Sequence, residues 1–213
     1  MERKLEKSVK QWLGVFIAIV SYIIHEGTHL LLALILGVFE KIRFVGIWGI
    51  QIVTTEGSLN GINLALFSGL SSIVTISIGY ILAFHPSIYK IKNKNILIAI
   101  YYITLCFLLL DPLYMSILSK FIGGGGDLNG IITGLKTSDI PFRIIFGIIL
   151  IINILLFKNK VCPKYNRIFK ENKNNINKNR YTILIIICIS IFILALLDNC
   201  VINYIEIVYN IVN

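Results

Sequence analysis

The sequence predicts an all-α, polytopic membrane protein with about five transmembrane helices and a short β-hairpin-like segment after the first. Of its 213 residues, 56% are hydrophobic and only 15% are charged. This balance is typical of a chain that crosses a bilayer several times. The apolar residues are grouped in long runs separated by short polar or basic stretches, and these runs predict spans at residues 11–39, 61–84, 96–122, 141–157 and 181–197.

The basic residues are distributed unevenly along the chain, which has a formal net charge of +9. With five spans, 15 of the 20 Lys and Arg residues fall on one side, in the segments 1–10, 90–94 and 158–180. Cytoplasmic loops carry this excess, so we expect an integral, multi-pass membrane protein with the N-terminus in the cytoplasm and the C-terminus outside. No motif or basic helical stripe indicates nucleic-acid binding.

The expected location is therefore a prokaryotic cell membrane, with the lipid bilayer as one partner. The predicted organisation has four segments. A basic cytoplasmic lead-in (1–10) is followed by a membrane core (11–158), a basic cytoplasmic loop (159–180) and a C-terminal transmembrane helix with its tail (181–213). Residues 201–212 are apolar but short, and either extend the last helix or lie along the membrane interface.

The hydrophobic period changes after the first span. Residues 42–55 are rich in β-branched and aromatic side chains and contain two glycines. This stretch is too short and too interrupted to form a transmembrane span. This pattern predicts a small hairpin or sheet at the membrane face. The alternative is a plain interfacial loop anchored by Trp48.

The first span contains the motif His25-Glu26-Gly27-Thr28-His29, which has the HExxH pattern. Residues i and i+4 share one face of a helix, so both imidazoles can reach one metal ion. Zn²⁺ accepts neutral imidazole nitrogen and keeps a position open for water at catalytic sites, where Glu26 would act as general base. A polar patch between helices is the alternative, but it explains neither the carboxylate nor the spacing.

Two aspartates are candidates for a third metal ligand. Asp111 precedes Pro112 inside the third predicted span, where proline should kink the helix. Its alternative role is to cap the helical segment after the kink. Asp127 follows four glycines and begins a short helix at residues 128–135. The glycines either let the chain fold back to place Asp127 beside the histidines, or form a flexible outer loop.

Other polar residues have less specific signals. His85 follows the second span directly and is expected at the interface rather than as a ligand. The second span has a face of small residues that should allow close contact with the first span, made by Ser68, Ser72, Thr75 and Gly79. We expect free thiols at all four cysteines, because no CxxC pair occurs among Cys106, Cys162, Cys188 and Cys200.

With these features the chain resembles the site-2 protease family of intramembrane zinc metalloproteases, and looks closest to its small, compact branch. The resemblance rests on the HExxH motif, on the strand-like stretch after it, and on Gly126-Asp127 followed by Pro141 and an apolar span. It covers roughly residues 11–158. Larger members usually show Leu-Asp-Gly, whereas this chain has Gly-Asp-Leu-Asn-Gly at residues 126–130.

The resemblance implies a three-helix core in which His25, His29 and Asp127 hold Zn²⁺ and Glu26 is the catalytic acid and base. It also implies hydrolysis of a peptide bond in or near a transmembrane segment of a membrane-protein substrate, with the strand-like stretch presenting an edge to the unwound substrate. The competing class is a non-proteolytic metal-binding membrane protein or a transporter. Transporters more often carry polar residues along a path and repeated halves, and neither is evident in this sequence.

Overall fold

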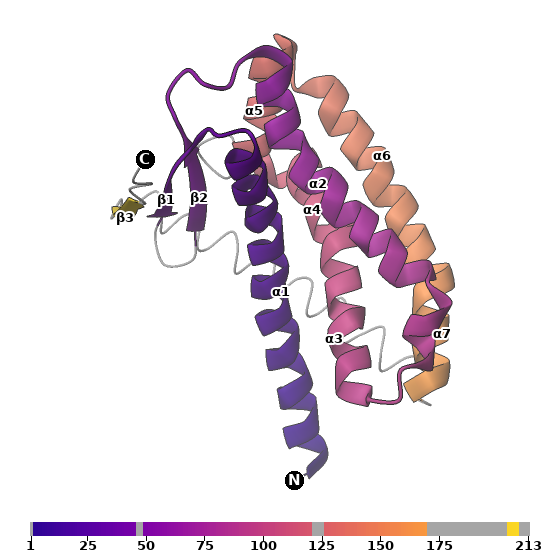
Figure 1. Cartoon of the computed structure of the whole chain (residues 1–213). Helices are drawn as coiled ribbons and strands as arrows, with labels where there is room; N and C mark the ends of the chain where they lie inside the picture. The colour runs from indigo at the N-terminus through magenta and orange to yellow at the C-terminus, as the bar shows by residue number, and fades with distance from the viewer. Residues whose placement is uncertain (1, 46–48, 121–125, 170–203, 209–213) are drawn as a thin grey trace.

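A computed structural model describes residues 2–45, 49–120, 126–169 and 204–208 of the chain (Figure 1). The described part is mostly helical, with a β-hairpin between the first two helices. The helices are α1 (Glu2–Ile35), α2 (Gly61–Phe84), α3 (Lys94–Leu105), α4 (Asp111–Ser116), α5 (Gly126–Leu135), α6 (Ile140–Leu156) and α7 (Cys162–Phe169). The strands are β1 (Phe39–Val45), β2 (Gly49–Thr54) and β3 (Tyr204–Val208). Short 3₁₀ turns are η1 (Pro86–Lys90) and η3 (Leu118–Lys120), and π turns are η2 (Cys106–Leu110) and η4 (Phe157–Val161).

Among the described residues, three helical stretches are long and apolar enough to cross a membrane, at Gly61–Phe84, Asn95–Ser116 and Ile140–Tyr165. A shorter apolar helix, Ile19–Ile35, lies within α1. The second span begins and ends as predicted. The fourth continues past residue 157 because Lys158 and Lys160 end the apolar run without ending the helix, which passes through η4 into α7. The fifth predicted span, 181–197, lies outside the described residues.

The helices form a bundle whose two ends are distinct (Figure 1). The start of α1, the connection between α2 and α3, and α7 lie at one end, whereas α5 and its connection to α6 lie at the other. Helix α2 packs against α1, α3 and α5. The predicted small-residue face of α2 is buried in these contacts, at Ser68, Ser72, Thr75 and Gly79.

Where a kink was predicted at Pro112, the chain has a π turn that leads into a new helix. Turn η2 leads directly into Asp111 and Pro112 at the start of α4. Pro112 has no N–H to donate to the carbonyl four residues earlier, which belongs to Leu108. The amide Nδ2 of Asn153 in α6 donates to that oxygen instead, over 2.8 Å. The side chain of Asn153 is fully buried, and its Oδ1 accepts a hydrogen bond from Tyr80.

The predicted hairpin is present, with β1 and β2 antiparallel and Ile42 opposite Ile52. Strand β1 also pairs with β3, so that the strand order is β2-β1-β3. The alternative in which residues 201–212 extend the last helix is therefore wrong for Tyr204–Val208, which form a strand. A five-residue apolar alternation is too short to predict a strand, and its partner β1 is distant in the sequence.

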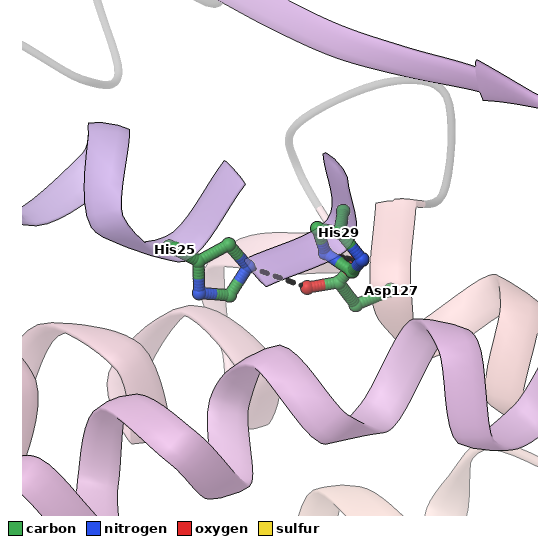
Figure 2. Close-up of side chains that lie close together, drawn as sticks. All are labelled: His25, His29 and Asp127. Carbon is green, nitrogen blue, oxygen red and sulfur yellow. Dashed lines mark hydrogen bonds and ion pairs between the residues drawn. The ribbon is translucent and has the colours of Figure 1, made fainter. Parts of the chain in front are cut away.

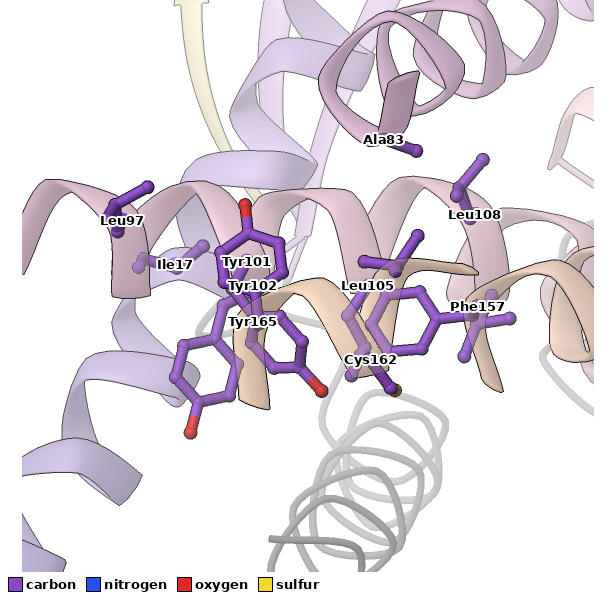
Figure 3. Packing of buried hydrophobic residues seen from close by; sticks show 12 residues of the cluster. Ile17, Ala83, Leu97, Tyr101, Tyr102, Leu105, Leu108, Phe157, Cys162 and Tyr165 are labelled. Carbon is purple, nitrogen blue, oxygen red and sulfur yellow. The ribbon is translucent and has the colours of Figure 1, made fainter. Parts of the chain in front are cut away.

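In the part of the chain that the structure describes, two apolar clusters hold the bundle together. The larger one joins α3 to η4 and α7, and the rings of Tyr101 and Tyr165 lie 4.9 Å apart at its centre (Figure 3). The smaller cluster lies between α2, α4, α5 and α6, and consists of Ile76, Met115, Leu128, Ile131 and Phe146. Because two of its members belong to α5, this cluster fixes the helix that carries Asp127.

Candidate metal centre

The two histidines of the HExxH motif lie one turn apart on α1 and face the same side of the helix. Their ring centroids are 5.3 Å apart and the rings meet edge to face. The His25 side chain is 16% exposed and the His29 side chain 6%. The ring of His29 also packs against Phe67 of α2, at a centroid distance of 5.1 Å. Helical spacing and packing on α2 therefore place both imidazoles between helices.

Asp127 reaches both histidines from the first turn of α5 (Figure 2). Its Oδ2 lies 2.8 Å from Nε2 of His25, and its Oδ1 lies 3.0 Å from Nε2 of His29. One potential ligand atom from each of the three residues lies within 4.8 Å of the others. The hydroxyl of Ser71 donates to Oδ2 of Asp127 over 3.3 Å. The structure thus brings together three side chains from segments about 100 residues apart.

Glycines allow α5 to come close enough to α2 for this contact. Asp127, Gly130 and Gly134 share one face of α5, at positions i, i+3 and i+7. A Cβ atom at Gly134 would lie 2.5 Å from the carbonyl oxygen of Gly61 and 2.7 Å from the backbone nitrogen of Ala65. A Cβ atom at Gly130 would overlap the side chain of Ser68. Of the four preceding glycines, which we expected to redirect the chain, Gly126 begins α5 with a φ of +33°. The other three, at residues 123–125, lie outside the described residues.

Glu26 lies beside this cluster. Its carboxyl group is partly buried and within electrostatic range of His25, His29 and Asp127. One turn earlier on α1, the hydroxyl of Tyr22 donates to the carbonyl oxygen of Ile50 over 2.9 Å and accepts from its N–H over 3.0 Å. These two bonds fasten strand β2 to α1 next to Glu26.

Asp111, the other candidate ligand, lies on a different side of His25. Its Oδ2 is 3.4 Å from Nδ1 of His25, whereas Asp127 faces Nε2. Its oxygens accept hydrogen bonds from two α2 hydroxyls, those of Ser72 over 2.8 Å and of Thr75. The predicted capping role is not the one observed, because α4 has no side-chain cap.

Sequence reasoning missed the hydroxyls that surround the two aspartates. Ser71 bonds Asp127, and Ser72 and Thr75 bond Asp111. The sequence showed these hydroxyls as part of a face of small residues on the second span. It could not show which groups they bond, because that depends on how α4 and α5 pack against α2. His85, expected at the interface, is exposed at the end of α2. Cys106 and Cys162 are buried, and Cys188 and Cys200 lie outside the described residues.

The donor set and its geometry fit a divalent transition metal ion. Ligand atoms at about 2.0–2.2 Å from a tetrahedral Zn²⁺ lie about 3.3 Å from one another. The three candidate ligand atoms lie within 4.8 Å of one another, which leaves room for such an ion after small side-chain shifts. Nδ1 of His29 is buried and has no hydrogen-bond partner among the described residues. Where an imidazole nitrogen without a proton faces a carboxylate oxygen, their lone pairs repel unless a cation lies between them. His25, His29 and Asp127 therefore form a group that a metal ion would stabilise.

Comparisons of the chain with protein-family models, with curated proteins and with solved structures find no match.

Proposed function

We propose that this chain is an intramembrane zinc metalloprotease that hydrolyses a peptide bond in or near a transmembrane segment of a membrane-protein substrate. The observation that carries the proposal is the meeting of His25, His29 and Asp127 within 4.8 Å, with Glu26 beside them on an apolar helix. Polar groups of this kind are costly between membrane helices and mark functional sites there. An HExxH motif and an acidic third ligand are the donor set of a hydrolytic zinc centre.

Each residue has a separate role in the proposed reaction. His25, His29 and Asp127 would hold the ion, and the bound Zn²⁺ would supply a Lewis acid that polarises the scissile carbonyl and activates water. Glu26 takes the proton of the attacking water and returns it to the departing amine. Ser71 supports the third ligand, because its hydroxyl bonds the Asp127 carboxylate.

The hairpin gives the proposed enzyme a surface for an extended substrate. A peptide bond within a membrane helix is protected by its own hydrogen bonds, so the substrate must unwind before cleavage. Strand β2 is at the edge of the described sheet and is fastened to α1 beside Glu26 through Ile50. We propose that the unwound segment pairs with this edge, in the manner of strand addition.

The proposed topology has five spans with the N-terminus in the cytoplasm. The three membrane-length helices and the apolar part of α1 supply four of these spans. The fifth is the apolar run at residues 181–197. The basic segments at residues 1–10 and 90–94 belong to the same end of the bundle in Figure 1, which agrees with a common cytoplasmic side.

The proposal is tested by metal content and cleavage in the purified protein. Glu26→Gln should retain one equivalent of Zn²⁺ but lose cleavage of a single-span test substrate in detergent, because only the base is removed. His25→Ala and Asp127→Asn should lose both. Glu56→Gln is the matched control, because Glu56 is exposed in the connection after β2, and it should retain both properties.

Full proteolysis by Glu26→Gln would show that the assigned base is wrong. A wild-type protein without bound transition metal would exclude a metalloprotease. Stoichiometric metal without chelator-sensitive cleavage would instead favour a metal-binding membrane protein of another kind.

A further inference from the structure

We infer that Asp111 is a positioning residue for His25: it accepts the Nδ1 proton and thereby directs Nε2 toward the metal. The inference rests on the proposed metal site and assigns a role that the motif does not specify. Ligand histidines generally donate their second ring N–H to a carboxylate, a carbonyl or water, which fixes the ring and its tautomer. In the described part of the chain, Asp111 is the carboxylate that faces Nδ1 of His25.

The surroundings of Asp111 hold it as a hydrogen-bond acceptor. Its side chain is only 9% exposed. Ser72 donates to Oδ1 and Thr75 donates to Oδ2, so hydroxyls from two successive turns of α2 orient the carboxylate. With those donors in place, Oδ2 faces Nδ1 of His25 at 3.4 Å. Both oxygens of Asp111 are thus placed as acceptors, and an imidazole that binds a metal through Nε2 has its N–H at Nδ1, where Asp111 lies.

The opposite side of the His25 ring is then available to a cation. Nδ1 and Nε2 point in divergent directions from the ring, so a carboxylate at Nδ1 cannot share an ion with Nε2. Asp127 faces Nε2 at 2.8 Å and is the acid grouped with the two histidines. The geometry therefore assigns different roles to the two aspartates, Asp127 as a ligand and Asp111 as the group that orients a ligand.

The two histidines are held by different means. Nδ1 of His29 has no hydrogen-bond partner among the described residues, and the His29 ring packs on Phe67 instead. In this assignment Asp111 orients His25 at Nδ1, whereas packing on Phe67 orients His29. Loss of Asp111 should affect His25 alone, which gives the inference a residue-specific signature.

The experiment measures Zn²⁺ affinity and the protonation of each imidazole nitrogen by ¹⁵N NMR in full-length protein labelled at histidine. Only three histidines are present in the chain, so His85→Gln and His29→Gln together assign the three sets of signals. We expect Nδ1 of His25 to carry a proton in the wild-type protein, with or without Zn²⁺. Asp111→Asn should weaken Zn²⁺ binding about 10–100-fold, the usual effect of removing such a partner, and should shift the His25 signals but not those of His29.

Asp139→Asn is the matched control, because Asp139 lies outside the centre and pairs with Arg143; Zn²⁺ affinity and both histidine spectra should be unchanged. A wild-type His25 without a proton on Nδ1 would overturn the inference, and this measurement needs no variant to fold. Complete loss of Zn²⁺ in Asp111→Asn, equal to the loss in Asp127→Asn, would make Asp111 a ligand and also overturn it. If wild-type protein bound no Zn²⁺, the proposed function would fail and the metal-directing role of Asp111 with it, while the Nδ1 measurement would still show whether Asp111 accepts the His25 proton.

Discussion

Gly134 determines how closely the helix that carries Asp127 can approach the centre of the bundle. The space beside it is occupied by the backbone of α2, at Gly61 and Ala65, rather than by flexible side-chain ends. A methyl group there could be accommodated only by moving one helix away from the other. The separation between Asp127 and the two histidines is therefore linked to a residue two turns away that has no chemistry of its own.

Gly134→Ala should destabilise the protein by about 1–3 kcal/mol, the usual cost of overpacking, and should weaken Zn²⁺ binding. The measurement is the unfolding midpoint in detergent together with a Zn²⁺ titration. Gly147→Ala is the matched control, because a Cβ atom there would meet nothing within 4 Å in α6. Equal behaviour of the two variants would contradict a close approach of α5 to α2.

At the scale of elements, the fold places α4 by replacing a hydrogen bond that Pro112 cannot make. Asn153 of α6 supplies an N–H to the carbonyl of Leu108, and Tyr80 of α2 bonds the same Asn153 side chain. Three helices thus meet at one buried amide. Because Asp111 and Pro112 follow directly, this contact also sets the position of the carboxylate that faces His25.

Asn153→Leu should cost about 1–3 kcal/mol, because it leaves the buried Leu108 carbonyl without a donor while preserving side-chain volume. Thermal unfolding in detergent measures this loss. Asn159→Leu is the control, because it makes the same substitution at an exposed position in η4. It should change the midpoint of thermal unfolding little. An unchanged midpoint for Asn153→Leu would mean that the Leu108 carbonyl finds another donor.

At the scale of the whole molecule, the two ends of the bundle differ in what they carry. The α2–α3 connection lies at the end where α1 begins, and the α5–α6 connection lies at the opposite end (Figure 1). The proposed topology places the first of these in the cytoplasm and the second outside. The candidate metal centre belongs to the end near α5, so it lies toward the outer face in this arrangement.

Cysteine labelling in intact cells tests this orientation. In a parent chain with its four cysteines replaced, Ser87→Cys in η1 should react only after the membrane is permeabilised. Ser138→Cys, between α5 and α6, should react with an impermeant reagent in intact cells. Both serines are exposed, so a difference in labelling reports the side of the membrane. The reverse pattern would invert the proposed topology.

Much of the fold could be predicted from local patterns in the sequence. The second span was located from its apolar run, and the hairpin from the change of period after the first span. The HExxH spacing was enough to place His25 and His29 on one face, because helical geometry alone sets that relation. The strand at Tyr204–Val208 could not be predicted, because its pairing with β1 joins segments more than 150 residues apart.

The sequence by itself determined the apolar helices and the shared face of the two histidines, since both follow from the order of neighbouring residues. Only the tertiary structure distinguished the surroundings of Asp127 and Asp111. The packing of α5 on α2 brings Asp127 to Nε2 of His25, and the π turn before α4 brings Asp111 to Nδ1. The two aspartates are alike as isolated residues, and they differ because each helix presents its carboxylate to a different side of the same ring.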